Sequence, residues 1–181
     1  CMYPLAGSTD EEVFRYAATA LSKAKDNGRN SYAFYHSVFT EAAAKKLRIV
    51  NELRTAIDDN QLVVHYQPVY SLGEQKIVGC EALVRWQHPQ QGLLMPDEFI
   101  SIAEESSLIG AIDNWVMLQA CRQAQQWRQQ GLLFEFISVN ISSRLFDRGD
   151  DLTANVQDAL SHSGLPAHNL ELEITESSIM G

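Results

Sequence analysis

The spacing of hydrophobic residues divides the chain into a helical first part and a second part in which strands and helices alternate. Apolar residues recur at helical spacing over residues 10–25 and again from Thr40 to Ile57, which predicts two amphipathic helices. A short strand is predicted between them, at residues 31–35. The second helix ends at Asp58-Asp59-Asn60 and is predicted to connect two domains.

From Leu62 onward the hydrophobic period becomes two, which is typical of strands. A short turn at residues 73–76 separates the first strand from a second at residues 77–86, so this pair is predicted to be an antiparallel hairpin. Helices with starts at Pro96-Asp97-Glu98 and Asp150-Asp151 precede further strands at residues 134–141 and 170–175. This order predicts an α/β fold with a parallel sheet after an antiparallel first strand.

The charge of the chain lies in this second part. The formal net charge is −9, and residues 61–181 carry all of it, because acidic and basic residues balance over residues 1–60. A protein with this negative charge does not attract the phosphate backbone of nucleic acids, so polymeric DNA or RNA is not expected as a partner. The excess of carboxylates suits divalent cations, although for any single acidic residue a solvated surface position is the simpler interpretation.

Cysteines and histidines form no metal-binding motif. The three cysteines have no Cys-x-x-Cys spacing, which indicates a cytoplasmic module without a disulfide framework. The histidines, scattered without ligand spacing, are His36, His65, His88, His162 and His168. The residues around Cys1 resemble the end of a strand, so we expect the chain to be part of a longer parent protein. The sequence leaves open whether that protein has a membrane anchor upstream.

One face of the second predicted strand carries two charges. Alternation places Glu81, Leu83 and Arg85 on the same face. Glu81 and Arg85 are roughly 13 Å apart along a strand, which is too far for a direct salt bridge. Each therefore needs its own partner if the strand is buried, and a cation for Glu81 and an anion for Arg85 would satisfy both. The alternative is that this face meets solvent.

Polar side chains also lie at the carboxyl ends of the later strands. Asn140 is near the end of the strand at residues 134–141, and Glu173 is near the end of the next one. Taken alone, each is an ordinary turn or surface residue. In a parallel α/β barrel, however, the carboxyl ends of the strands converge, and Glu81, Asn140 and Glu173 then supply three hard oxygen donors. This set predicts a Mg²⁺ or Mn²⁺ site.

Four segments in order resemble the successive signatures of EAL domains, a family of cyclic di-GMP phosphodiesterases. They are VHYQPVY at residues 64–70, EALVRW at 81–86, SVNIS at 138–142 and LEITES at 172–177. The resemblance implies that Glu81, Asn140 and Glu173 bind the metal and that Glu81 is catalytic. It implies that the residues contacting the cyclic dinucleotide are Gln67, Leu83 and Arg85. Glu176 resembles a catalytic-site glutamate that anchors a mobile loop.

The resemblance implies metal-dependent hydrolysis of cyclic di-GMP to the linear dinucleotide in bacterial signalling. Residues 61–181 would form the N-terminal half of a TIM-like (β/α)₈ barrel with an antiparallel first strand, since a complete barrel needs about 250 residues. The family's remaining aspartates, lysine and glutamate are then expected beyond Gly181, and the chain alone is expected to be inactive. The alternatives are a catalytically inactive EAL domain that acts as a cyclic di-GMP receptor, and a TIM-barrel enzyme of unrelated chemistry.

The upstream part resembles the end of a second family. Residues 1–38 are similar to the C-terminal tail of a GGDEF, or diguanylate cyclase, domain, which would supply the last helix and strand of that α/β domain, and residues 39–60 would be a helical linker. Lys25 matches a family lysine that approaches nucleotide phosphates, whereas Ala18 and Ser22 depart from the family pattern. We expect the parent protein to carry upstream GGDEF and sensory domains, and it could form a homodimer through its EAL domain.

Overall fold

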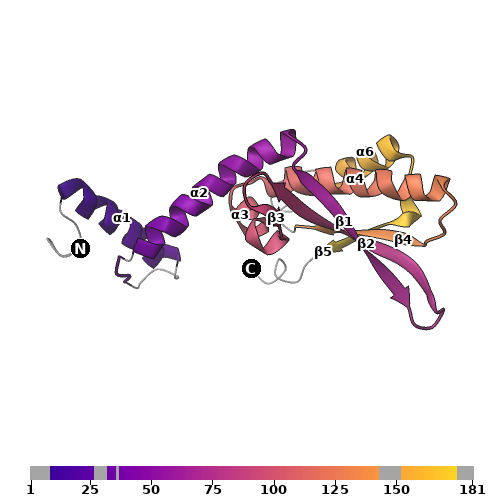
Figure 1. Ribbon diagram of the computed structural model, residues 1–181, viewed down its shortest axis with the longest axis horizontal. Helices are drawn as coiled ribbons and strands as arrows, with labels where there is room; N and C mark the ends of the chain where they lie inside the picture. Colours follow the sequence, from indigo (N-terminus) through magenta and orange to yellow (C-terminus); the bar gives the residue numbers. More distant parts are fainter. Residues whose placement is uncertain (1–8, 27–31, 36, 143–151, 175–181) are drawn as a thin grey trace. The chain divides into compact units, whose positions relative to one another are not determined.

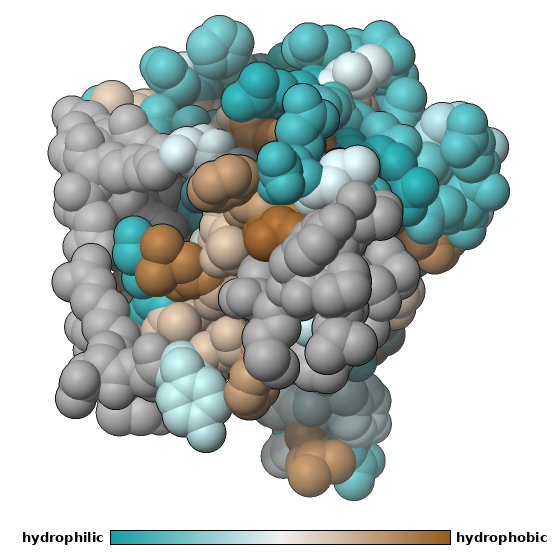
Figure 2. Space-filling model, turned by 90° about the vertical axis from the view of Figure 1, so that its left-hand side faces the viewer, coloured by the Kyte–Doolittle hydropathy of each residue, from teal (hydrophilic) through white to brown (hydrophobic). Residues whose placement is uncertain are grey.

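The structure is a computed structural model that describes residues 9–26, 32–35, 37–142 and 152–174. The chain divides into two compact units, residues 1–51 and 52–181, and the division falls within the sequence of helix α2 (Ser37–Asp58). This boundary falls within the linker predicted at residues 39–60. Among the described residues, none of the helices has the length and apolar character needed to cross a bilayer. Figure 2 shows apolar patches, in brown, among hydrophilic residues on the face that it displays.

The first unit contains helix α1 (Asp10–Asp26), which begins close to the predicted position. The hydroxyl of Thr9 accepts the backbone N–H of Glu12 at 3.3 Å, and the acidic first turn complements the helix dipole. The strand predicted at residues 31–35 is wrong, because residues 32–35 have no regular secondary structure. The ring of Tyr35 instead stacks on that of Tyr16 in α1, with centroids 3.9 Å apart, and among the described residues this segment has no strand with which to form a ladder.

The second unit is built on one sheet with the order β1-β2-β4-β5, and β3 pairs with the end of β2. The hairpin β1–β2 is antiparallel, whereas β2–β4 and β4–β5 are parallel, as the sequence predicts. The short strand β3 was not predicted. The strands are β1 (Leu62–Ser71), β2 (Lys76–His88), β3 (Gly92–Leu94), β4 (Phe136–Ile141) and β5 (Leu170–Ile174).

Helices cover one face of this sheet. Figure 1 shows α4 lying along the sheet with α6 beside it. The core between α4 and the sheet contains Ile112 and Met117 from the helix and Ala82 and Val139 from the strands, all at most 2% exposed. The helices of this unit are η1 (Pro96–Glu98), α3 (Ile100–Glu105), α4 (Ile109–Gln129), α6 (Leu152–Ser163) and η2 (Ala167–Asn169).

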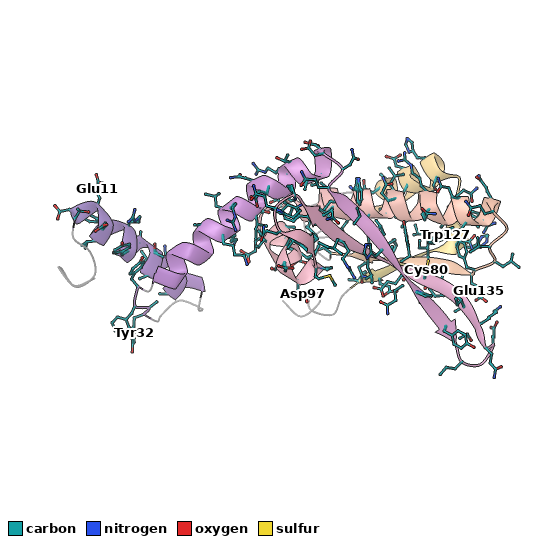
Figure 3. All side chains as sticks on the ribbon, in the orientation of Figure 1. Glu11, Tyr32, Cys80, Asp97, Trp127 and Glu135 are labelled. Carbon is teal, nitrogen blue, oxygen red and sulfur yellow. The ribbon has the colours of Figure 1, made fainter. Side chains whose placement is uncertain are left out.

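Two tryptophans fix the covered face of the hairpin. Trp86 of β2 is fully buried, packs edge-to-face on Phe99 and donates its indole N–H to Oε1 of Gln61 at 3.2 Å. Trp127, near the end of α4, packs edge-to-face on Tyr66 of β1. Figure 3 shows Trp127 on the helix and Cys80 on the strand, and both residues line an apolar groove of about 380 Å³. Side chains that alternate with these residues along the strands are therefore directed to the opposite face of the sheet.

The connection between α3 and α4 contains a strained residue. Ser107 has a φ of 71°, in the left-handed region that costs a non-glycine residue about 1–2 kcal/mol. We expect Ser107→Gly to raise the free energy of unfolding by about 0.5–1 kcal/mol after the entropy of the more flexible unfolded chain is subtracted. Urea unfolding would measure the change. Ser106→Gly is the matched control and should destabilise, because the Ser106 hydroxyl donates to the carbonyl of Ile102 at 2.7 Å. If the free energy of unfolding of Ser107→Gly is unchanged or lowered, the backbone of Ser107 is not strained.

Candidate functional site

The site is centred on a contact between the two middle strands of the sheet. Glu81 lies in β2 on the face opposite to the buried Ala82, and Asn140 lies next to the end of β4. The Asn140 side chain donates from Nδ2 to Oε1 of Glu81 at 2.6 Å. Both side chains are half-buried. The structure thus brings together two residues 59 positions apart that the sequence predicts to be metal ligands.

The strands on either side add two more predicted site residues to this face. Glu173 of β5 is in register with Asn140, and Gln67 of β1 is in register with Glu81. Both side chains are exposed. Because residues in register on adjacent strands have their side chains on the same face, these four residues share one face of the sheet. They form two neighbouring rows, Gln67 with Glu81 and Asn140 with Glu173, since Glu81 is in register with Ser138, two residues before Asn140. Glu176 lies outside the described residues.

The two remaining predicted residues lie further along β2 toward its carboxyl end. Leu83 is opposite His65 and Arg85 is opposite Val63, and both are half-buried. The Arg85 guanidinium donates to the backbone carbonyl of Val84 at 2.8 Å. The sequence suggested a cation for Glu81 and an anion for Arg85, but the structure gives each a neutral hydrogen-bond partner. Neutral partners satisfy the geometry of a hydrogen bond without balancing the charge, so ions remain suitable ligands for both residues.

The donor set fits a hard cation. Glu81 and Asn140 are already in contact, and that contact engages Oε1 and Nδ2, so Oε2 and Oδ1 are the oxygens that could reach a cation. Glu173 supplies a further carboxylate in register. Oxygen donors of this kind suit Mg²⁺ or Mn²⁺ better than zinc. Within the part of the chain that the structure describes, no group of three His, Cys, Asp or Glu side chains could hold a metal, so these residues supply only part of a coordination shell.

Behind the site lies a buried acidic residue that was not predicted. Asp113 of α4 is 6% exposed, and its Oδ2 accepts the backbone N–H of Ser142 at 2.9 Å. Burial raises the pKa of Asp113 to about 7; the hydrogen bond from Ser142 opposes this shift and the nearby carboxylate of Glu104 adds to it. The sequence contains a signal for this residue, because Asp113 falls four residues after Ile109 on the apolar stripe of its helix. A carboxylate on such a stripe needs a buried partner.

Known proteins resemble this chain in sequence and fold. The EAL domain family matches residues 50–181. The bifunctional diguanylate cyclase/cyclic di-GMP phosphodiesterase MucR of Pseudomonas aeruginosa is 40% identical over 179 residues, which are 99% of this chain and 26% of that protein. The cyclic di-GMP phosphodiesterase PdeR of Escherichia coli is 35% identical over 177 residues, 98% of this chain and 26% of that protein. The chain thus spans about a quarter of the length of these relatives.

Solved structures of EAL domains share the fold. The structure of the MucR phosphodiesterase in complex with cyclic di-GMP matches with a TM-score of 0.68 at 40% identity, over 74% of this chain and 53% of that one. The FimX EAL domain of Xanthomonas citri, also in complex with cyclic di-GMP, matches with a TM-score of 0.65 at 28% identity, over 77% of this chain and 53% of that one. These matches confirm the predicted α/β fold, with a sheet that is not closed into a barrel. The chain therefore belongs to the EAL domain family.

Proposed function

We propose that the parent protein hydrolyses one phosphodiester bond of cyclic di-GMP and releases the linear dinucleotide, in a reaction that requires Mg²⁺ or Mn²⁺. The observation that carries this proposal is the cluster of Glu81, Asn140 and Glu173 on one face of the sheet, in which a 2.6 Å contact joins Asn140 to Glu81 and the strand register places Glu173 beside Asn140. The proposal is further supported by relatives named as cyclic di-GMP phosphodiesterases, with which the chain shares up to 40% of its residues.

In this proposal the residues have separate tasks. Glu81, Asn140 and Glu173 hold the cation, which when bound supplies positive charge that lowers the pKa of a water molecule and stabilises the transition state. Arg85 binds a phosphate oxygen or a guanine edge, because a guanidinium can exchange a backbone carbonyl for an anionic partner. Gln67 and Leu83 contact the dinucleotide from the same face. Glu176 anchors a loop over the site.

A cyclic di-GMP receptor without hydrolytic activity is the second candidate. The FimX EAL domain, whose structure contains cyclic di-GMP, has the same fold over most of this chain. Binding without cleavage needs the contacts of Arg85 and Gln67 but not the metal chemistry.

Glu173→Gln tests the hydrolytic proposal. We expect this substitution to lower kcat by at least about 100-fold at all Mn²⁺ concentrations, because a neutral amide is a poor ligand for a hard cation. The matched control is Glu135→Gln, which removes an exposed carboxylate just before β4, at the opposite end of that strand from Asn140, and should change kcat by less than about 3-fold. The release of the linear dinucleotide from the parent protein would be followed by chromatography.

The outcome distinguishes the two candidates. Equal kcat values for Glu173→Gln and the unmodified protein would remove Glu173 from the metal site. If the unmodified protein binds cyclic di-GMP in calorimetry but does not cleave it at any Mg²⁺ or Mn²⁺ concentration, the receptor is the correct function.

A further inference from the structure

The end of β4 is held from its covered face by a carboxylate. Ser142 follows the last residue of β4 and lies two positions after Asn140. Its backbone N–H donates to Oδ2 of Asp113 in α4 at 2.9 Å. Asp113 and Ser142 are 6% and 8% exposed, so water does not compete strongly for this bond.

A second carboxylate acts on the same residue. The Ser142 hydroxyl donates to Oε1 of Glu104 in α3 at 3.2 Å. The backbone and the side chain of Ser142 are thus bound by two different helices. Two bonds from separate elements restrict both the position and the rotation of the peptide that follows the strand.

A cavity borders this part of the strand. A cavity of about 270 Å³ lies between the sheet and helices α3 and α4, and its lining includes Glu104, Asp113, Asn140 and Ser142. Side chains that border a cavity lose contacts on that side, so Asn140 and Ser142 receive less support from packing than the fully buried Ile141 between them does. The hydrogen bonds from Ser142 to Asp113 and Glu104 therefore add to the packing of Ile141 in fixing the end of the strand.

We propose that Asp113 is a positioning residue for Asn140: by binding the N–H of Ser142 it fixes the end of β4 so that the Asn140 amide stays in contact with Glu81. A hydrogen bond of 2.6 Å between short side chains weakens steeply when either strand shifts. Asp113 is on the opposite side of the sheet from Glu81 and acts only through the backbone of β4. The consequence for cation binding rests on the proposed function, whereas the effect on the Asn140–Glu81 contact does not.

The experiment compares three substitutions in the parent protein. Asp113→Asn keeps an acceptor oxygen for Ser142, whereas Asp113→Leu keeps the volume without an acceptor and Asp113→Ala removes both. The first readout is the NMR resonance of the Asn140 side-chain amide protons, assigned from their absence in Asn140→Ala. The second readout is Mn²⁺ affinity, measured by electron paramagnetic resonance of the free ion. Thermal unfolding checks that each variant is folded.

We expect Asp113→Leu and Asp113→Ala to move the Asn140 amide resonance upfield and to weaken Mn²⁺ binding by about 10- to 100-fold. Asp113→Asn should retain the resonance and an affinity within about 3-fold. An unchanged resonance in folded Asp113→Leu or Asp113→Ala overturns the proposal, and so does Asp113→Asn behaving like Asp113→Leu. If the unmodified protein neither binds Mn²⁺ nor cleaves cyclic di-GMP, the proposed function fails, and the amide resonance alone still decides the role of Asp113.

Discussion

Glu81→Ala in the parent protein should lower the turnover of cyclic di-GMP by about 1,000-fold or more. The substitution removes a charged oxygen ligand and leaves the Asn140 amide without the acceptor that it contacts at 2.6 Å. Two of the three predicted ligands are therefore disturbed by one change. Because Glu81 is only half-buried, we expect the free energy of unfolding to fall by no more than about 1–3 kcal/mol.

The control for this prediction is Glu135→Ala. Glu135 is an exposed glutamate just before β4, where it pairs with Lys76 at 3.3 Å, so its removal changes the net charge equally without touching the site. We expect turnover of this variant to remain within about 3-fold of the unmodified protein, since exposed ion pairs contribute little. Metal-dependent release of the linear dinucleotide would be measured for both variants. Full turnover by Glu81→Ala would exclude Glu81 from the metal site.

The positions of the candidate site residues on the sheet could be predicted from the sequence because strand geometry is local. Alternation alone places Glu81, Leu83 and Arg85 on one face, and the βαβ order makes β2, β4 and β5 parallel. Together these rules bring Asn140 beside Glu81, as the structure shows. The roles of these residues in metal and substrate binding stay predictions, because they depend on ligands rather than on backbone geometry.

The features that were mispredicted or missed depend on contacts between distant segments. The strand at residues 31–35 was inferred from composition, but a strand requires a partner for its ladder, and Tyr35 packs on α1 instead. Strand β3 is only three residues long and exists through its pairing with β2. The bond from Ser142 to Asp113 joins residues 29 positions apart. The sequence shows an acid on an apolar helix stripe, but it does not show which strand end will meet it.

Asp113 should also make the stability of the second unit depend on pH. Burial among apolar side chains raises its pKa from an ordinary 3.8 to about 7, with a smaller contribution from Glu104 and an opposing one from the Ser142 N–H. Between these two values the folded protein retains a proton on Asp113 that the unfolded chain has released. The stabilising contribution of the protonated form is therefore complete below about pH 4 and is lost as the pH rises to about 7. Above pH 7 both states are ionised and the effect is constant.

Asp113→Asn removes this titration, since an amide stays neutral. We compare the free energy of unfolding of Asp113→Asn with that of the unmodified protein at each pH. From pH 4 to pH 8 this difference should change in favour of Asp113→Asn by on the order of 4 kcal/mol. The three tryptophans of this chain, Trp86, Trp115 and Trp127, all lie in the second unit, so urea unfolding of the 181-residue chain followed by tryptophan fluorescence reports on that unit. Asp97→Asn, at an exposed position, should give a much smaller change over the same range. Parallel pH profiles for Asp113→Asn and the unmodified protein would show that Asp113 is ionised throughout, held in that form by Ser142 despite its burial.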